Sequence, residues 1–328
     1  MTFSYDLAGK RVWVAGHTGM VGGAIVRRLA QESCTVLTAS HRDLDLTRQA
    51  ETEAWIAAQR PDAIFLTAGR VGGIHANSTL PSEFLYENLM IAANVIRAAH
   101  ANDVGRLLFL GSSCIYPREA PQPIPESALL TGPLEPTNEW YALAKIAGIK
   151  LAQALRREFG RDYISAMPTN LYGPGDNFHP LHSHVPAALL SRFHAAKEAN
   201  DPEVAVWGTG RPLREFMHVD DMADACVFLM RRYSGEEIVN VGSGEEVSIA
   251  GFAALIAEAV GYAGRVHFDT SHPDGMPRKL LDSSRLREIG WRRKIPLGEG
   301  LRGYYHWFLQ NRRGLRGLAL ETETKVSK

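Results

Sequence analysis

The chain of 328 residues is 45% hydrophobic and 22% charged, a composition typical of a globular protein with ample material for a core. Its 36 basic and 36 acidic residues cancel, so no overall field attracts nucleic acid or a membrane surface, and we expect neither as a partner. Three cysteines without CxxC spacing, no secretory signal and no apolar run of roughly 20 residues favour a soluble cytoplasmic protein without disulfides.

Strands and helices alternate through the first half of the sequence. Short apolar segments predict strands, and apolar residues every three or four positions predict helices. The expected strands are 11–15, 35–39, 63–68, 106–110 and 163–167, and the expected helices are 20–31, 47–59, 81–102 and 138–159. Continuous apolar strands between amphipathic helices indicate a parallel sheet covered on both faces. We therefore predict an α/β, Rossmann-type doubly wound fold, which binds ligands at the carboxyl ends of its strands.

Beyond Pro168 this alternation stops. Residues 179–184, 192–207 and 248–294 are expected to be loop-rich and mixed, while 237–241 predicts one more strand of the sheet. The expected division is a nucleotide-binding domain of 1–175 with about 213–244, a smaller discontinuous α/β domain of about 176–212 with 245–315, and a frayed polar tail of 316–328.

A glycine-rich loop follows the first strand and opens the first helix. Its GxxGxxG spacing allows a tight turn and a close approach by a pyrophosphate, which the helix N-terminus attracts. The spacing alone is common, but its position between strand and helix favours a dinucleotide site. The residues assigned to this site are Gly16, His17, Thr18, Gly19, Met20, Val21 and Gly22.

The end of the second strand bears on which dinucleotide binds. An acidic residue at this place binds a ribose diol, whereas an arginine accommodates a 2′-phosphate. Arg42 comes first, with Asp43 and Asp45 behind it, and this order favours NADP over NAD. A solvated loop charge is the alternative interpretation of Arg42. Asp45 and Leu46 are placed at the border of the adenine.

Hydroxyl, thiol, phenol and ammonium groups gather around the fourth strand and the helix after it. Ser112 and Cys114 follow the strand, and Tyr141 and Lys145 are four residues apart, on one face of the helix. A phenol with a pKa of about 10 is a poor catalyst at neutral pH. An adjacent ammonium group is expected to bring the pKa of Tyr141 toward neutrality. A chance surface pair, a loop-capping serine and a buried apolar cysteine are the alternatives.

These features resemble the extended short-chain dehydrogenase/reductase family, in which serine, tyrosine and lysine form the catalytic triad. The segments GSSCIYP, EPTNEWYALAKIAGIK, MPTNLYGPGDNFHP and VWGTGRPLREFMHVDDMA resemble its branch that converts GDP-4-keto-6-deoxy-D-mannose to GDP-L-fucose. The resemblance implies that Ser112, Tyr141 and Lys145 are the triad. It further implies that Cys114 is the base and His184 the acid that invert C3 and C5, before NADPH reduces C4.

The resemblance also implies the remaining ligand contacts. The nicotinamide side of the cofactor is assigned to Leu110, Gly111, Ser112, Ser113, Lys145, Pro168, Thr169, Asn170, Leu171 and His184. The GDP-sugar is assigned to Asn170, Arg192, Trp207, Arg214, Asp274 and Lys279. Arginine forks suit diphosphate oxygens, and an indole can cover a base or ribose. The alternatives are a solvent-facing charge for Arg192 and a core position for Trp207.

Three expectations concern other partners and functions. His179, His182 and His184 are close in sequence, but no fourth ligand follows at a suitable spacing, so we expect no metal. The helices 81–102 and 138–159 are long enough to pair across a two-fold axis, so we expect a homodimer with a four-helix interface. Another nucleotide-sugar epimerase or dehydratase of the same fold and a non-catalytic NADP-sensing protein stay open as alternative functions.

Overall fold

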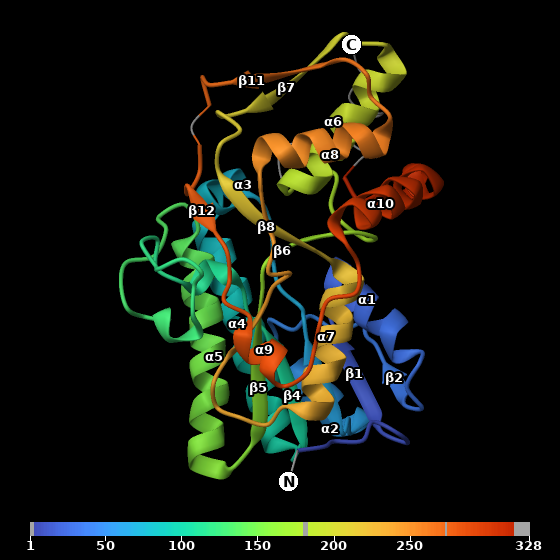
Figure 1. Ribbon diagram of the computed structural model, residues 1–328. Helices are drawn as coiled ribbons and strands as arrows, with labels where there is room; N and C mark the ends of the chain where they lie inside the picture. Colours follow the sequence, from blue (N-terminus) through green and yellow to red (C-terminus); the bar gives the residue numbers. More distant parts are fainter. Residues whose placement is uncertain (1–2, 180–182, 273, 318–328) are drawn as a thin grey trace.

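The structure, a computed structural model, describes residues 3–179, 183–272 and 274–317. Figure 1 shows one part built around a parallel sheet and, above it, a second part with shorter strands and the helices α6, α8 and α10. None of the helices within the described residues is long and apolar enough to cross a bilayer.

A six-stranded parallel sheet forms the centre of the first part. Its strand order is β2-β1-β3-β4-β5-β9, with every neighbouring pair parallel. The strands are β1 (Arg11–Ala15), β2 (Thr35–Leu37), β3 (Ala63–Leu66), β4 (Arg106–Leu110), β5 (Asp162–Pro168) and β9 (Val239–Val241). The predicted Rossmann-type sheet is confirmed, including the strand expected near residue 240.

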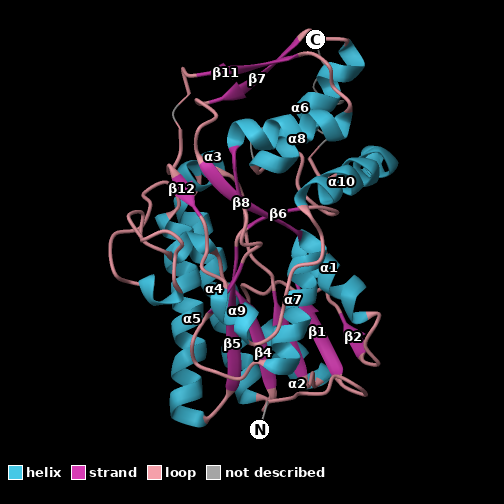
Figure 2. Ribbon diagram, in the orientation of Figure 1, coloured by secondary structure: helices cyan, strands magenta, loops and turns pink. Residues whose placement is uncertain are grey.

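Helices cover both faces of this sheet (Figure 2). One face packs against α1 (Met20–Leu29) and α7 (Val219–Arg232), and the other against α2 (Gln49–Gln59), α4 (Pro81–Ala101) and α5 (Glu139–Phe159). Alternate strand residues supply the two cores because successive side chains point to opposite faces. In β4, Leu107 and Phe109 belong to the α4 and α5 side, whereas Leu108 and Leu110 belong to the α1 and α7 side.

The second part is organised around β8 (Leu213–His218). This strand is antiparallel to β10 (Glu246–Ser248) and parallel to β6 (Asn170–Tyr172) and β12 (Arg278–Lys279). A third core joins these strands to three helices through contacts such as the stacked rings of Phe216 and Phe252, whose centroids are 3.8 Å apart. The other elements are α3 (Ile74–Thr79), α6 (Val185–Ala199), β7 (Glu203–Trp207), α8 (Ile249–Val260), β11 (Arg265–Asp269), α9 (Ser284–Glu288) and α10 (Leu297–Asn311).

The helices α6 and α8 lie partly or wholly in stretches that we expected to be loop-rich, so that expectation is wrong there. The Ser248 hydroxyl caps α8 by accepting a hydrogen bond from the Gly251 amide, and Gly261 ends the helix with φ of +70°. Residues 249–260 are almost uniformly apolar. The buried residues Phe252, Ala253, Ile256 and Val260 lie on one face of α8, but apolar residues also occupy the rest of the helix, so the sequence alone does not mark the buried face.

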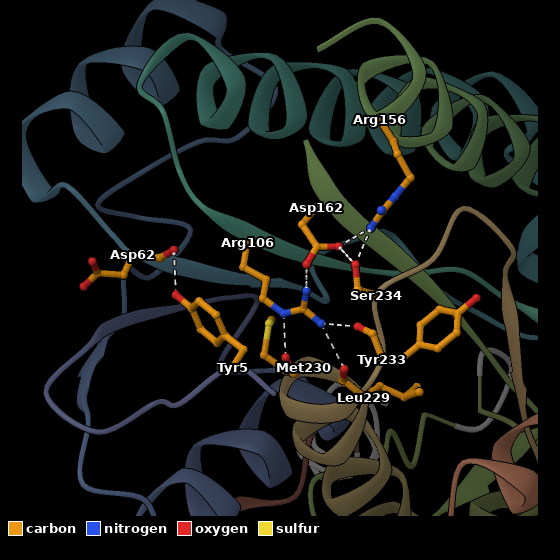
Figure 3. A network of polar contacts seen from close by, with 9 residues as sticks. All are labelled: Tyr5, Asp62, Arg106, Arg156, Asp162, Leu229, Met230, Tyr233 and Ser234. Carbon is orange, nitrogen blue, oxygen red and sulfur yellow. Dashed lines mark hydrogen bonds and ion pairs between the residues drawn. The ribbon is translucent and has the colours of Figure 1, made fainter. Parts of the chain in front are cut away.

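A buried arginine links the central strand β4 to the end of α7 (Figure 3). Arg106 is 0% exposed and pairs with Asp162 on β5. Its guanidinium also donates to carbonyl oxygens of Leu229, Met230 and Tyr233. The last carbonyls of a helix have no partner within the helix. Arg106 therefore caps α7 while it neutralises Asp162.

Replacing this side chain tests its contribution to stability. Arg106→Met leaves Asp162 with one buried partner fewer and strips the end of α7 of its donor, so we expect a loss of about 3 kcal/mol in unfolding free energy. Urea unfolding measures it. Arg157→Met is the matched control, because Arg157 pairs with Glu236 at the surface, where such pairs contribute under about 1 kcal/mol. Equal losses in the two variants would contradict the assignment.

Candidate active site

The glycine loop lies where the ends of β1 and β3 meet, the position at which the sheet connections diverge in opposite directions. Gly16 has φ of +94°, and a Cβ atom there would lie 2.6 Å from the Ala68 amide nitrogen. A Cβ atom on Gly22 would overlap the Gly16 carbonyl oxygen. Gly19 precedes α1 and carries no capping side chain, so the first amides of the helix remain available to a phosphate.

One further observation fits an anionic ligand at this loop. The Nδ1 atom of His17 is buried and has no hydrogen-bond partner among the described residues. An unpaired buried polar atom is costly unless a ligand or water satisfies it. The bare helix start, the tight glycine turn and this nitrogen together suit the pyrophosphate of a dinucleotide.

Three residues in the loop after β2 are predicted to contact the adenosine end of the cofactor, and their side chains have different environments. Arg42 is exposed and forms no ion pair with a described residue. The Asp45 carboxylate instead accepts hydrogen bonds from the amide and hydroxyl of Thr47, at 3.0 and 2.7 Å. Leu46 is buried in the core, and its carbonyl accepts from Asn94 at 2.9 Å. Arg42 is therefore available to a ligand, whereas Asp45 and Leu46 shape the loop.

The predicted triad assembles at the end of β4 and the start of α5. The Ser112 hydroxyl accepts from the Cys114 amide at 3.2 Å and also shares a hydrogen bond with the Tyr141 hydroxyl. The Lys145 Nζ lies 5.7 Å from the centroid of the Tyr141 ring. Lys145 is buried, and its ammonium donates to the Leu110 carbonyl at 2.9 Å. Serine, tyrosine and lysine thus share one small volume.

The expected direction of the Tyr141 pKa is wrong in this structure. Burial raises the pKa of Tyr141, and the charge of Cys114 adds to the increase, while the bond to Ser112 opposes it. The Lys145 ammonium is bonded to a carbonyl, and burial lowers the pKa of Lys145 to about 8. A phenol with a raised pKa stays protonated at neutral pH, and this form suits a proton donor.

Lys279 is related to both Cys114 and His184, by a contact with the first and by its charge for the second. Cys114 lines a small pocket with Asn138 and Lys279, so it is not part of the hydrophobic core. The Lys279 Nζ lies 3.8 Å from the Cys114 Sγ. His184 is open to solvent just before α6, yet surrounding protein lowers its pKa by desolvation, with the charge of Lys279 as the second cause. Lys279 therefore contacts Cys114, and its charge is one cause of the lowered pKa of His184.

The residues predicted for the nucleotide part of the substrate lie around β7 and β8. The Arg192 guanidinium lies 5.3 Å from the centroid of the Trp207 ring, and Trp207 is 56% exposed. This exposure excludes a core role for the tryptophan. Asp274 accepts from the Thr209 amide at 2.9 Å, and its negative charge acts on Arg214. Two arginines, an aromatic face and a carboxylate are thus close to one another.

Glu215 is a residue that the sequence analysis missed. It is fully buried in β8, and its carboxylate accepts from the amides of Gly244 and Leu281 at 2.7 and 3.2 Å. Its backbone carbonyl accepts from the Thr169 hydroxyl at 3.3 Å and the Asn170 amide at 2.9 Å. The side chains of Thr169 and Asn170 therefore join the two sheets, besides any ligand contact. The sequence offered little signal for its burial, because β8 (LREFMH) mixes apolar and polar residues.

Other predicted residues lie at the same edge or beyond the described chain. Those at or just after the carboxyl ends of β4 and β5 are Leu110, Gly111, Ser113, Pro168 and Leu171. His272 was not predicted, although its ring lies 4.4 Å from that of Trp207, since nothing in the sequence marks a loop histidine. Within the described residues no cluster of His, Cys, Asp and Glu could hold a metal, and His182 falls outside those residues.

The model of the NAD dependent epimerase/dehydratase family matches residues 12–242. The chain belongs to this family. "Probable GDP-L-fucose synthase 1" of Oryza sativa subsp. japonica is 60% identical over 312 residues, covering 94% of this chain and 95% of that protein. "GDP-L-fucose synthase" of Escherichia coli strain K12 is 53% identical over 320 residues, covering 94% and 99%.

A solved structure is similar to this chain over nearly the whole length of both. It is a GDP-L-fucose synthetase from Naegleria fowleri bound to NADP, with a TM-score of 0.88, 25% identity and coverage of 96% of this chain and 98% of that one. The likeness therefore includes both the parallel sheet and the second part of the fold.

The choice between NADPH and NADH tests the role of Arg42. In Arg42→Ala the guanidinium that can pair with a 2′-phosphate is gone, so we expect NADPH affinity to fall about tenfold or more. NADH affinity should change little, because NADH has no 2′-phosphate. Fluorescence titration of the purified protein measures both. Arg48→Ala in the same region is the control, and a parallel loss for both nucleotides would contradict the assignment.

Proposed function

We propose that this protein converts GDP-4-keto-6-deoxy-D-mannose to GDP-L-fucose, by epimerisation at C3 and C5 and then NADPH-dependent reduction at C4. The observation that carries the proposal is a thiol, Cys114, beside a complete reductase triad and in a pocket next to Lys279. A simple ketone reductase needs the triad but not an additional acid–base pair. The names of the relatives at 53% and 60% identity support the same reaction.

The epimerisation uses the acidity of the carbons next to the C4 ketone. Cys114 removes a proton from C3 or C5, and the electron pair of the broken C–H bond passes to the C4 oxygen as an enolate. The Ser112 hydroxyl stabilises this developing charge. His184 returns a proton to the opposite face, which inverts the carbon. Cysteine and histidine suit these roles because both can change protonation state near neutral pH.

The reduction uses the triad. When bound, NADPH supplies the hydride that reduces C4. Tyr141 donates a proton to the C4 oxygen, and its raised pKa keeps that proton in place until the oxygen becomes basic. Lys145 holds the nicotinamide ribose with its ammonium group, while Arg42 binds the 2′-phosphate.

Residues of the second part of the chain bind most of the substrate. Arg192 and Arg214 bind the diphosphate, since guanidinium forks pair well with its oxygens. Trp207 and Asp274 bind the nucleoside, and Asn170 and Lys279 lie toward the hexose. We propose a division into a nucleotide-binding domain and a discontinuous substrate domain at the boundaries predicted above.

Two observations weigh against the alternative functions. A 4-epimerase has no use for Cys114 and His184 as a pair, and a sensing protein without turnover has no need to keep Ser112, Tyr141 and Lys145 in contact. We also propose a cytoplasmic location, supported by the three free cysteines, Cys34, Cys114 and Cys226, because a reducing compartment keeps thiols unpaired.

Separating the two half-reactions tests the proposed function. Cys114→Ser should lose more than about a hundredfold of its deuterium incorporation from D₂O at C3 and C5, the size of a lost acid–base catalyst, while it still binds NADPH. Tyr141→Phe should abolish C4 reduction but keep the deuterium exchange. NMR of the sugar and NADPH absorbance measure the two steps. Wild-type protein that never places deuterium at either carbon would reject the epimerase activity.

We further propose a homodimer in which α4 and α5 of two copies form a four-helix interface. These neighbouring helices carry exposed apolar side chains, Tyr86 (60%) and Leu89 (37%) on α4 and Leu143 (43%) on α5. Exposed large apolar residues on two neighbouring helices favour association over exposure to water. The isologous packing of two such helix pairs would cover them.

Charge placed on these helices tests the interface. The double variant Leu89→Asp with Leu143→Asp buries two carboxylates in a dimer but none in a monomer, so we expect it to sediment as a monomer at micromolar concentration. Leu309→Asp on α10 is the control, since Leu309 is equally exposed, at 46%, but lies on another helix. A monomeric wild-type protein, or a double variant that stays dimeric, would contradict the proposal.

A further inference from the structure

We propose that Lys279 controls the charge of Cys114: its ammonium group, held against the sulfur, stabilises the thiolate that removes protons from the sugar. Lys279 is then a positioning residue for the base, in addition to any contact with the substrate. The inference rests on the proposed function, because the thiolate matters only if Cys114 is a base.

The contact itself is the first observation. The Lys279 Nζ lies 3.8 Å from the Cys114 Sγ, and both residues line the same small pocket. No carboxylate forms an ion pair with Lys279 in the part of the chain that the structure describes. The neighbouring Arg278, by contrast, pairs with Glu246 at 2.7 Å. The charge of Lys279 is therefore directed at the thiol without a competing anion.

The backbone around Lys279 fixes this arrangement. Lys279 pairs with Arg214 in the parallel register between β12 and β8. On its other side, the Leu280 amide donates to the Gln122 side chain at 2.9 Å, and the Leu280 carbonyl accepts from the Ile124 amide at 2.8 Å. Residues 122–124 follow Cys114 on the same loop. The strand that carries the ammonium is thus tied to the loop that carries the sulfur.

The other ionisable groups near the thiol act in different directions. Tyr141 faces it from α5, and its pKa is raised by burial and then by the charge of Cys114. Glu135 lines the same pocket, but its carboxylate lies 3.7 Å from Arg118. Desolvation lowers the pKa of His184, and the charge of Lys279 is the second cause. Among these groups, Lys279 is the one whose ammonium contacts the sulfur.

The proposed removal of a proton from carbon requires the ionised sulfur. The thiolate, not the thiol, takes a proton from carbon, forming an S–H bond while the C–H electron pair moves to the ketone. An opposite charge within about 4 to 6 Å favours the ionised form of a group. A lysine in contact with the sulfur raises the fraction of protein ready for the first step at neutral pH.

Alkylation of the ligand-free protein tests the inference. Iodoacetamide reacts with thiolates, and peptide mass spectrometry separates Cys114 from Cys34 and Cys226. In Lys279→Met we expect labelling of Cys114 at pH 7 to slow about tenfold or more, the effect of removing a nearby opposite charge. The difference should shrink at about pH 10, where an ordinary thiol is also ionised. Lys279→Arg, which keeps the charge, should label close to the wild-type rate.

The controls separate this role from substrate binding and from misfolding. A residue that only binds substrate would raise KM in Lys279→Met and leave the labelling rate unchanged, and that result would overturn the inference. Unchanged NADPH binding and an unchanged circular dichroism spectrum show that Lys279→Met is folded. If Lys279→Met is not folded, Lys279→Gln is used in its place. If labelling of Cys114 depends on Lys279 but the protein does not turn over the GDP-sugar, the proposed function is rejected. The effect of Lys279 on the thiol is then still supported.

Discussion

The buried carboxylate of Glu215 holds the two parts of this protein in register. It satisfies the Gly244 and Leu281 amides, while the carbonyl of the same residue binds Thr169 and Asn170. Desolvation raises the pKa of Glu215, and the hydrogen bonds that it accepts oppose the increase. A buried acid of this kind is tolerated only where donors surround it. The end of the parallel sheet, β8 and the segment that follows β12 therefore meet at one fixed point.

This junction explains why residues far apart in sequence can share one site. Cys114 comes from the end of β4 in the nucleotide-binding part, whereas Lys279 comes from β12 in the second part, 165 residues later. Their contact requires the two sheets to keep one relative position, which the bonds of Glu215 supply. Low local polarity then strengthens every charge interaction in the site, as the pKa values of Lys145 and His184 indicate.

Much of the fold followed from local patterns. The strands of the parallel sheet are short apolar runs, and Tyr141 and Lys145 share a helix face because they are four residues apart. The failures have a common cause. The loop-rich expectation is wrong for α6 and α8, and the expected direction of the Tyr141 pKa is wrong because the folded chain desolvates its phenol. Such properties come from contacts between distant segments, which a linear pattern does not contain.

The raised pKa of Tyr141 has a consequence for the proton balance of the reduction. If Tyr141 donates the proton to the C4 oxygen, as proposed, its raised pKa means that the phenol is protonated before each reduction, and the tyrosinate that forms must be reprotonated. Reprotonation of the tyrosinate from bulk water is then thermodynamically favourable. Each sugar that is reduced takes one hydrogen ion from solution. The hydrogen ion is therefore a reactant in the overall equilibrium, which depends on the pH of the medium. The phenol of Tyr141 itself stays protonated over a wide pH range.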